Sequence, residues 1–504
     1  MRRRYGYKLG AGLLGAPLNF GIQLMATRAL GPAGYGSFSF LSGFFNDVIS
    51  FFDSGTSTGF YAKLCARPAE QTLIVFYWRF LAAVSLALVG LTAVVITSGG
   101  LDRFWPGQAP LWIALALLNA LSTWGLNVAG KILDAYGLTV QAERARLISR
   151  VFGFVLVAGL FAAGGLLLPT YFIALCSVAV VQLFVWEHKA RRAGRHMFPS
   201  GGVSGTQTRA YGREFWSYSS PLLTYAFIGM VAGVADRWML QRFAGAAEQG
   251  FYGISSQVGA VCFLLTSAMV PLISREFAQA HAAGDLGRMR SAFENYIPKF
   301  YEITCIISVF LSFHARDVAI LAGGPQFAGA GAAMALMCLA PIHQTYGQLS
   351  GAVLYATGET RLYRNIGVSV LLLGLLMNVA LLASPSEGGL GLGAEGLAIK
   401  WITIQFIGVN LQLWFNARLL GLSFPRLLAR QLFPVAVLFF VAFFTAWPLP
   451  SAWPSLAALV VAAGLYVGTI VILTCIWPSM TRLPVRIWIR TLATLARRKR
   501  WRNI

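Results

Sequence analysis

Long apolar segments recur along the whole chain, from about residue 8 to residue 478, and the polar stretches between them are short. A helix needs about 20 mostly apolar residues to cross the hydrocarbon core of a bilayer. Windows of that length predict an all-α polytopic membrane protein with about 14 transmembrane helices. The second, seventh and twelfth of these carry the most polar residues. The predicted spans are 8–29, 35–59, 72–98, 109–130, 145–165, 168–188, 215–241, 248–273, 298–320, 328–354, 364–384, 394–416, 430–448 and 455–477.

The composition extends this prediction to the entire chain. Only 12% of the 504 residues are charged, about half the share in a typical soluble protein. The chain therefore has too little polar surface to cover a water-exposed globule, and the membrane part is not an anchor on a soluble domain. The N-terminus is basic, but no clear cleavage site follows the first apolar segment. We therefore expect a retained first helix and no signal peptide.

The formal net charge is +22, and its placement favours a membrane orientation over nucleic-acid binding. Lys and Arg gather in alternate loops, whereas the loops between them are nearly free of cations. An excess of cations marks cytoplasmic loops. This contrast places both termini in the cytoplasm and requires an even number of spans. Aromatic residues do not alternate with basic ones as in a nucleic-acid interface, so no nucleic-acid partner is expected.

The segment 481–504 is basic, with apolar residues between its arginines. That pattern is typical of an interfacial helix on anionic lipid. A cytoplasmic tail without a binding role has the same composition. Both interpretations remain open at this point.

Two blocks of sequence recur at nearly constant spacing. Residues 25–42 match 239–256 at an offset of 214, and residues 130–153 match 351–374 at an offset of 221. A shift of six helices is even, so the two copies have the same orientation, which is a parallel repeat. We expect two six-helix lobes with a cavity between them, and a tight external turn from Gly31 to Gly36. The predicted parts are 1–212 (N-lobe), 213–420 (C-lobe), 421–480 (two extra helices) and 481–504 (tail).

Several predicted spans contain charged or amide side chains. A charge at the bilayer centre costs about 2.5–3.5 kcal/mol on insertion scales, so it must face a wet cavity or a partner. For each of these residues a local pairing or capping role is the alternative; Lys400 is expected to be the most isolated. The cavity candidates are Arg28, Asp47, Asp53, Arg237, Arg242, Lys400, Asn19, Gln23 and Gln405.

The sequence contains no pattern of an enzyme. There is no GxSxG, Walker or HExxH motif and no His/Cys/Asp cluster at metal spacing. The predicted external loops are short, whereas membrane glycosyltransferases and polymerases place catalytic acids or arginines in large ones. We therefore predict a protein that is not an enzyme and has no catalytic residue, metal or cofactor.

The segment Arg28–Phe38, RALGPAGYGSF, resembles the R-x-LGP-x-x-YG-x-F motif of polysaccharide flippases in the multidrug/oligosaccharidyl-lipid/polysaccharide (MOP) exporter superfamily. Asp53-Ser54-Gly55 resembles an acid-x-Gly element late in their second helix. The resemblance implies a Wzx-like flippase of O-antigen or exopolysaccharide repeat units in the bacterial inner membrane. The implied substrate is an oligosaccharide linked to undecaprenyl pyrophosphate.

The resemblance also implies partners and coupling. A polysaccharide polymerase, a chain-length regulator and membrane lipids are the implied partners. Related lipid II flippases hold a cation on their seventh, eleventh and twelfth helices. Asp236, Asn378 and Thr403 lie on those helices here, which gives a hypothesis of Na⁺ or H⁺ coupling. A multidrug exporter of the same superfamily and a membrane-embedded glycan polymerase or transferase remain the alternatives.

Overall fold

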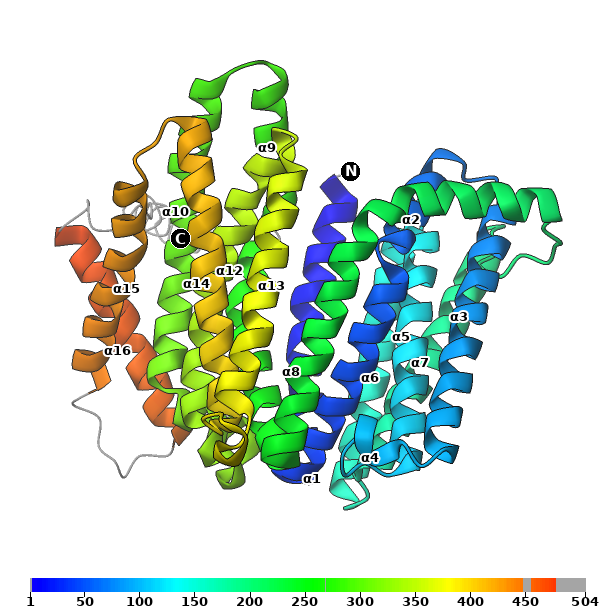
Figure 1. Cartoon of the computed structure of the whole chain (residues 1–504), viewed down its shortest axis with the longest axis horizontal. Coiled ribbons are helices and arrows are strands. Elements are labelled where there is room, and N and C mark those ends of the chain that lie inside the picture. Colours follow the sequence, from blue (N-terminus) through cyan, green and yellow to red (C-terminus); the bar gives the residue numbers. More distant parts are fainter. Residues whose placement is uncertain (1, 268, 447–454, 477–504) are drawn as a thin grey trace, which may run out of the picture. The chain divides into compact units, whose positions relative to one another are not determined.

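The computed structural model describes residues 2–267, 269–446 and 455–476, and the regular secondary structure in this part is helical (Figure 1). The predicted tail 481–504 lies outside the described residues. Two short 3-10 helices occur at Pro325–Ala330 and Pro385–Glu387. The α-helices are α1 (Arg2–Asp53), α2 (Thr56–Ala66), α3 (Gln71–Thr97), α4 (Leu101–Phe104), α5 (Pro110–Ala135), α6 (Thr139–Ala162), α7 (Leu168–Arg192), α8 (Gly205–Ser267), α9 (Val270–Ala282), α10 (Leu286–Phe313), α11 (Ala315–Gly323), α12 (Gly331–Ala356), α13 (Thr360–Leu382), α14 (Gly393–Leu420), α15 (Phe424–Ala446) and α16 (Ser455–Ile476).

The chain is a multi-pass membrane protein. Among the described residues, nine helices are long and apolar enough to cross a bilayer, or ten if the bent helix α8 is counted as one span. The predicted count of fourteen is therefore not confirmed. Helices α1 and α14 are not among these spans, and both contain charged or amide side chains, which lower the hydropathy of a helix.

The helices divide into two compact units, each with its own core. The first comprises Met1–Gly253 and Asn378–Gly393, and the second comprises Ile254–Met377 and Ala394–Ile504. Aromatic side chains such as Phe40, Tyr77 and Trp124 fill the first core, and Phe293 and Tyr301 fill the second. The predicted lobe boundaries at residues 212 and 420 stay a prediction.

Helices α1 and α8 are each broken at a single glycine. Gly31 has φ 67° and ψ 179°, and Gly245, its equivalent in the sequence repeat, has φ 87° and ψ −178°. This backbone region is accessible almost only to glycine. The helix resumes directly after each glycine, so the predicted turn is present at Gly31, but its predicted extent to Gly36 was wrong. One residue with positive φ is enough to redirect the chain.

The two breaks also contact each other within the first unit. A Cβ atom on Gly36 would come within 1.6 Å of the carbonyl oxygen of Ala246, and a Cβ on Gly250 within 2.1 Å of that of Pro32. Gly36 and Gly250 hold equivalent positions in the repeat, and so do Pro32 and Ala246. The contact is therefore reciprocal: each copy of the repeat supplies a glycine to the backbone of the other. We call it the glycine contact.

The second block of the repeat has matching local structure as well. At the offset of this block, 221 residues, helices α5 and α12 begin at matching positions, Pro110 and Gly331, and end at matching positions, Ala135 and Ala356. The glycines that follow them, Gly137 and Gly358, both have φ 77°. The sequence repeat thus corresponds to a repeat of helix lengths and of helix ends.

Candidate functional site

A charged cluster joins α1 to α8 inside the first unit. The guanidinium of Arg237 donates a hydrogen bond through Nη1 to the carbonyl oxygen of Ser39 at 3.0 Å, and its Nε lies 3.9 Å from Oδ2 of Asp47. The two charged side chains are 24% and 35% exposed, so neither is sealed in the core. Because charges are costly in hydrocarbon, both must face a polar space. The structure thus brings together two of the predicted cavity residues.

Two glycines make room for this ion pair. A Cβ on Gly43 would lie 1.9 Å from Nε of Arg237, and a Cβ on Gly233 would lie 2.6 Å from Oδ2 of Asp47. Each charged group therefore packs against the bare backbone of the facing helix. The buried amide of Gln249 adds a hydrogen bond from Nε2 to the carbonyl oxygen of Arg237. Sequence reasoning missed the two glycines and Ser39.

Next to this pair, Asp236 contacts Asn378, which α13 contributes to the first unit. Asn378 Nδ2 donates to Oδ1 of Asp236 at 2.6 Å, and Asn378 and Asp236 are 0% and 5% exposed, respectively. The Oδ1 atom of Asn378 has no hydrogen-bond partner among the described residues. Two of the three predicted cation-coupling residues therefore touch. The third, Thr403, belongs to the second unit and donates to the carbonyl oxygen of Ile399 on its own helix.

The other candidates on α1 and α8 have different surroundings. Gln23 donates to the hydroxyl of Tyr35 at 3.2 Å. Asn19, Arg28 and Arg242 are exposed. Arg28 and Arg242 occupy equivalent places in the repeat, on the N-terminal side of the glycine that breaks each helix.

Asp53 ends α1 and binds the start of α2. Its carboxylate accepts hydrogen bonds from the backbone N–H of Ser57 at 3.1 Å and from the Ser57 hydroxyl at 2.7 Å. The hydroxyls of Thr56 and Tyr77 each lie 3.3 Å from its Oδ1. These contacts match the capping role that was the alternative interpretation of Asp53.

In the second unit, Lys400 lies on α14 and is 2% exposed. Its Cε atom packs against Gly374, where a Cβ would come within 2.9 Å, and its ammonium lies 5.5 Å from the ring centroid of Trp401. Lys400 is therefore not isolated, contrary to the expectation from the sequence. Gln405, on the same helix, is half-buried.

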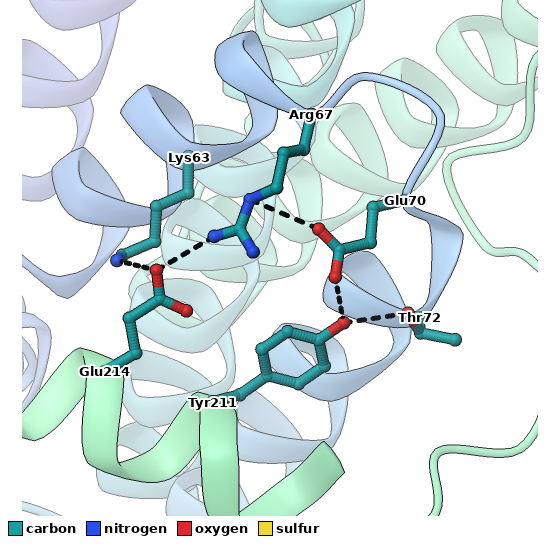
Figure 2. A network of polar contacts seen from close by, with 6 residues as sticks. All are labelled: Lys63, Arg67, Glu70, Thr72, Tyr211 and Glu214. Carbon is teal, nitrogen blue, oxygen red and sulfur yellow. Dashed lines mark hydrogen bonds and ion pairs between the residues drawn. The ribbon is translucent and has the colours of Figure 1, made fainter.

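A separate polar network fastens the first part of α8 to the α2–α3 connection, and Figure 2 shows its six side chains. Glu214 forms ion pairs with Lys63 and with Arg67, the latter at 2.9 Å. Arg67 also lies 3.3 Å from Glu70, whose other oxygen accepts from the Tyr211 hydroxyl. The Thr72 hydroxyl lies 2.9 Å from that of Tyr211. We call these six residues the interfacial network. Five of its residues, all but Thr72, lie outside the spans predicted from the sequence, and the network precedes the 67° bend between Gly205–Ser220 and Leu223–Phe263.

The interfacial network predicts a pH-dependent attachment. The hydrogen bond from Lys63 lowers the pKa of Glu214 below its ordinary value of 4.5. A lowered pKa means that the pairing is fully present above that value and is lost as the pH falls through the lowered pKa. A spin label at residue 209, introduced as Arg209→Cys in a Cys65→Ser background, should have constant mobility from about pH 7 to pH 5 and higher mobility in stronger acid.

The Glu214→Gln variant is the control for this titration. Its label should be mobile at every pH, because the carboxylate is gone. Equal mobility in both proteins at neutral pH would contradict the fastening role of Glu214.

No protein-family model matches the sequence, and no curated protein matches it. Solved structures match its fold. The lipid II flippase MurJ in an inward closed conformation superposes with a TM-score of 0.68 at 12% identity, over 94% of this chain and 99% of that one. An inward-facing multidrug resistance transporter of the MATE family, in the MOP superfamily, gives 0.64 at 14% identity, over 81% of this chain and 96% of that one. The chain therefore shares its fold with this flippase and this multidrug resistance transporter.

Proposed function

We propose that the protein is a flippase that moves undecaprenyl-pyrophosphate-linked oligosaccharide repeat units from the cytoplasmic to the periplasmic leaflet. The observation that carries the proposal is the cluster of Arg237, Asp47 and Asp236 on broken helices of a MOP-type fold. Polar residues of this kind within membrane spans line substrate or ion pathways. The fold that holds them is shared with a lipid II flippase.

The proposed cavity residues suit such a substrate. A pyrophosphate is anionic, and the cations among them, Arg28, Arg237 and Arg242, attract it. Sugar hydroxyls need hydrogen-bonding groups, which the amides of Asn19, Gln23 and Gln405 supply. We infer alternating access, with the repeats of the fold rocking against each other.

Cation coupling is the second part of the proposal. Asp236 and Asn378 offer oxygen ligands, and a carboxylate can bind Na⁺ or a proton; Thr403 is the third proposed ligand. We infer a bacterial inner-membrane location with both termini in the cytoplasm, and a polysaccharide polymerase and chain-length regulator as partners. A multidrug exporter is the alternative, favoured by the MATE-family neighbour.

Deleting the gene and locating the lipid-linked repeat units tests the proposal. Units that stay on the cytoplasmic face support a flippase. Unpolymerised units that accumulate on the periplasmic face would instead identify a polymerase. Unchanged units, together with new sensitivity to cationic drugs, would favour the exporter.

Lys400→Ala tests whether this buried lysine of the second unit is needed for function. We expect loss of complementation at normal protein levels. The Lys400 side chain is only 2% exposed within a predicted span, and a charge there is costly in free energy, which favours a functional role. Lys400→Arg is the matched variant and should retain part of the activity. Full complementation by the alanine variant would remove Lys400 from the mechanism.

A further inference from the structure

A cavity of about 470 Å³ lies beside the interfacial network in the first unit. Its walls come from the end of α1, from α3 and from the first part of α8. They are mostly aromatic, with Phe51, Phe76, Tyr77, Phe80, Phe215 and Trp216 among the lining residues. The volume falls within the range of small-molecule sites, about 300–1,000 Å³. Of the described residues that line it, none is charged.

The segment Gly205–Ser220 forms one side of this cavity. Its buried residues Tyr211, Phe215 and Ser219 recur every four positions and so share one helix face. That face packs on α3, where the Phe76 ring centroid lies 5.3 Å from that of Tyr211 and 5.7 Å from that of Phe215. Trp216 also lines the cavity and is 65% exposed. Tryptophan favours the membrane–water interface, so we expect lipids at the depth of this interface to have access to the cavity.

One polar atom in the cavity lining is unsatisfied. Ser219 is 5% exposed, and its hydroxyl has no hydrogen-bond partner among the described residues. The other lining hydroxyls are engaged, since Thr56 and Tyr77 lie 2.9 Å apart and bond each other. A buried hydroxyl without a partner is costly. The cavity is therefore complementary to a hydrocarbon that carries one hydrogen-bond acceptor.

We propose that this cavity binds one acyl chain of a membrane phospholipid, with Ser219 donating to the ester carbonyl. The walls offer no positive charge to a pyrophosphate and few free hydrogen-bonding groups to a sugar. A polyprenyl chain fits the walls but has no carbonyl for Ser219. The bilayer supplies acyl esters at the interface, where Trp216 lies. A bound lipid would hold Gly205–Ser220 against α3, so the lipid is part of the joint that precedes the bend in α8.

Photocrosslinking of the full chain tests this site. The protein is reconstituted in phosphatidylethanolamine and phosphatidylglycerol vesicles, doped with phosphatidylglycerol that carries a diazirine near the ester of one acyl chain. We expect crosslinks in α3 near Phe76 and in α8 near Phe215, mapped by mass spectrometry. Ser219→Ala should lower the labelling by roughly two- to tenfold, the effect of one hydrogen bond.

Filling the cavity gives the decisive comparison. Gly212 lines it, and a Cβ there would meet no atom within 4 Å, so Gly212→Phe should lower labelling at least about tenfold. Gly205→Phe is the matched control in the same segment, also with open space at its Cβ, and should label as the wild type does. Equal labelling of the two variants would overturn the proposal.

The remaining outcomes separate acyl chains from other ligands. If unlabelled undecaprenyl phosphate abolishes the crosslinks at a molar ratio where added phosphatidylglycerol does not, the site is isoprenoid-specific and the acyl assignment is wrong. Unchanged labelling in Ser219→Ala would contradict the proposed hydrogen bond to the ester carbonyl. This test does not depend on whether Gly212→Phe folds. None of these measurements requires the protein to translocate a substrate, so they test the lipid site independently of the proposed function.

Discussion

Arg237→Gln is expected to lower the translocation rate at least about tenfold while the amount of folded protein in the membrane stays normal. The guanidinium is the cation beside Asp47, and glutamine leaves that carboxylate without it in a membrane span. The expected size follows from the cost of an unpaired intramembrane charge, about 2.5–3.5 kcal/mol. The measurement is the accessibility of lipid-linked repeat units to a periplasmic enzyme, normalised to protein level.

A double-mutant cycle sharpens this test. If Asp47 and Arg237 act as a pair, Asp47→Asn together with Arg237→Gln should be less damaging than the sum of the two single changes. Arg213→Gln is the matched control, because Arg213 is an exposed arginine on the interfacial part of the same helix. Additive losses would mean that the two charges work separately.

Gly36→Leu should destabilise the glycine contact, and we expect its effect to be the second-largest after that of Arg237→Gln. A Cβ at this position would come within 1.6 Å of the Ala246 carbonyl oxygen, so the backbones of α1 and α8 must separate. Overpacking of this kind costs about 1–3 kcal/mol or more. We expect a lower midpoint of thermal unfolding, measured on the purified full chain.

Gly90→Leu on α3 provides the control, because a Cβ at Gly90 meets no atom within 4 Å. Its unfolding midpoint should stay close to that of the wild type. The repeat supplies a second check, since Gly250→Leu should reproduce the effect of Gly36→Leu. A large difference between the two glycine variants would show that the contact is not functionally reciprocal.

Local features were largely predictable from the sequence. The apolar segments predicted a polytopic helical protein, and the RALGPAGYGSF motif predicted the MOP-type fold. The first block of the repeat located the equivalent glycines Gly31 and Gly245. These predictions succeed because helix length, polarity and glycine content are properties of neighbouring residues.

Contacts between distant parts were not predictable in the same way. Arg237 and Ser39 are 198 residues apart, and no local pattern states which arginine meets which carbonyl. The turn predicted for Gly31 to Gly36 was too long because the sequence does not reveal which of several glycines takes the positive φ. Lys400 looked isolated because its contact with Gly374 depends on packing between α13 and α14.

The glycine contact also bears on how the two copies of the repeat can diverge. Duplicated segments ordinarily diverge position by position, because each residue is constrained only by the residues that it contacts in its own copy. Here a side chain gained at Gly36 is opposed by the backbone at Ala246, and one gained at Gly250 by that at Pro32. Each glycine is therefore constrained by the backbone of the other copy, and we expect a side chain to be rejected at Gly36 and at Gly250 alike, whichever residues occupy positions 32 and 246.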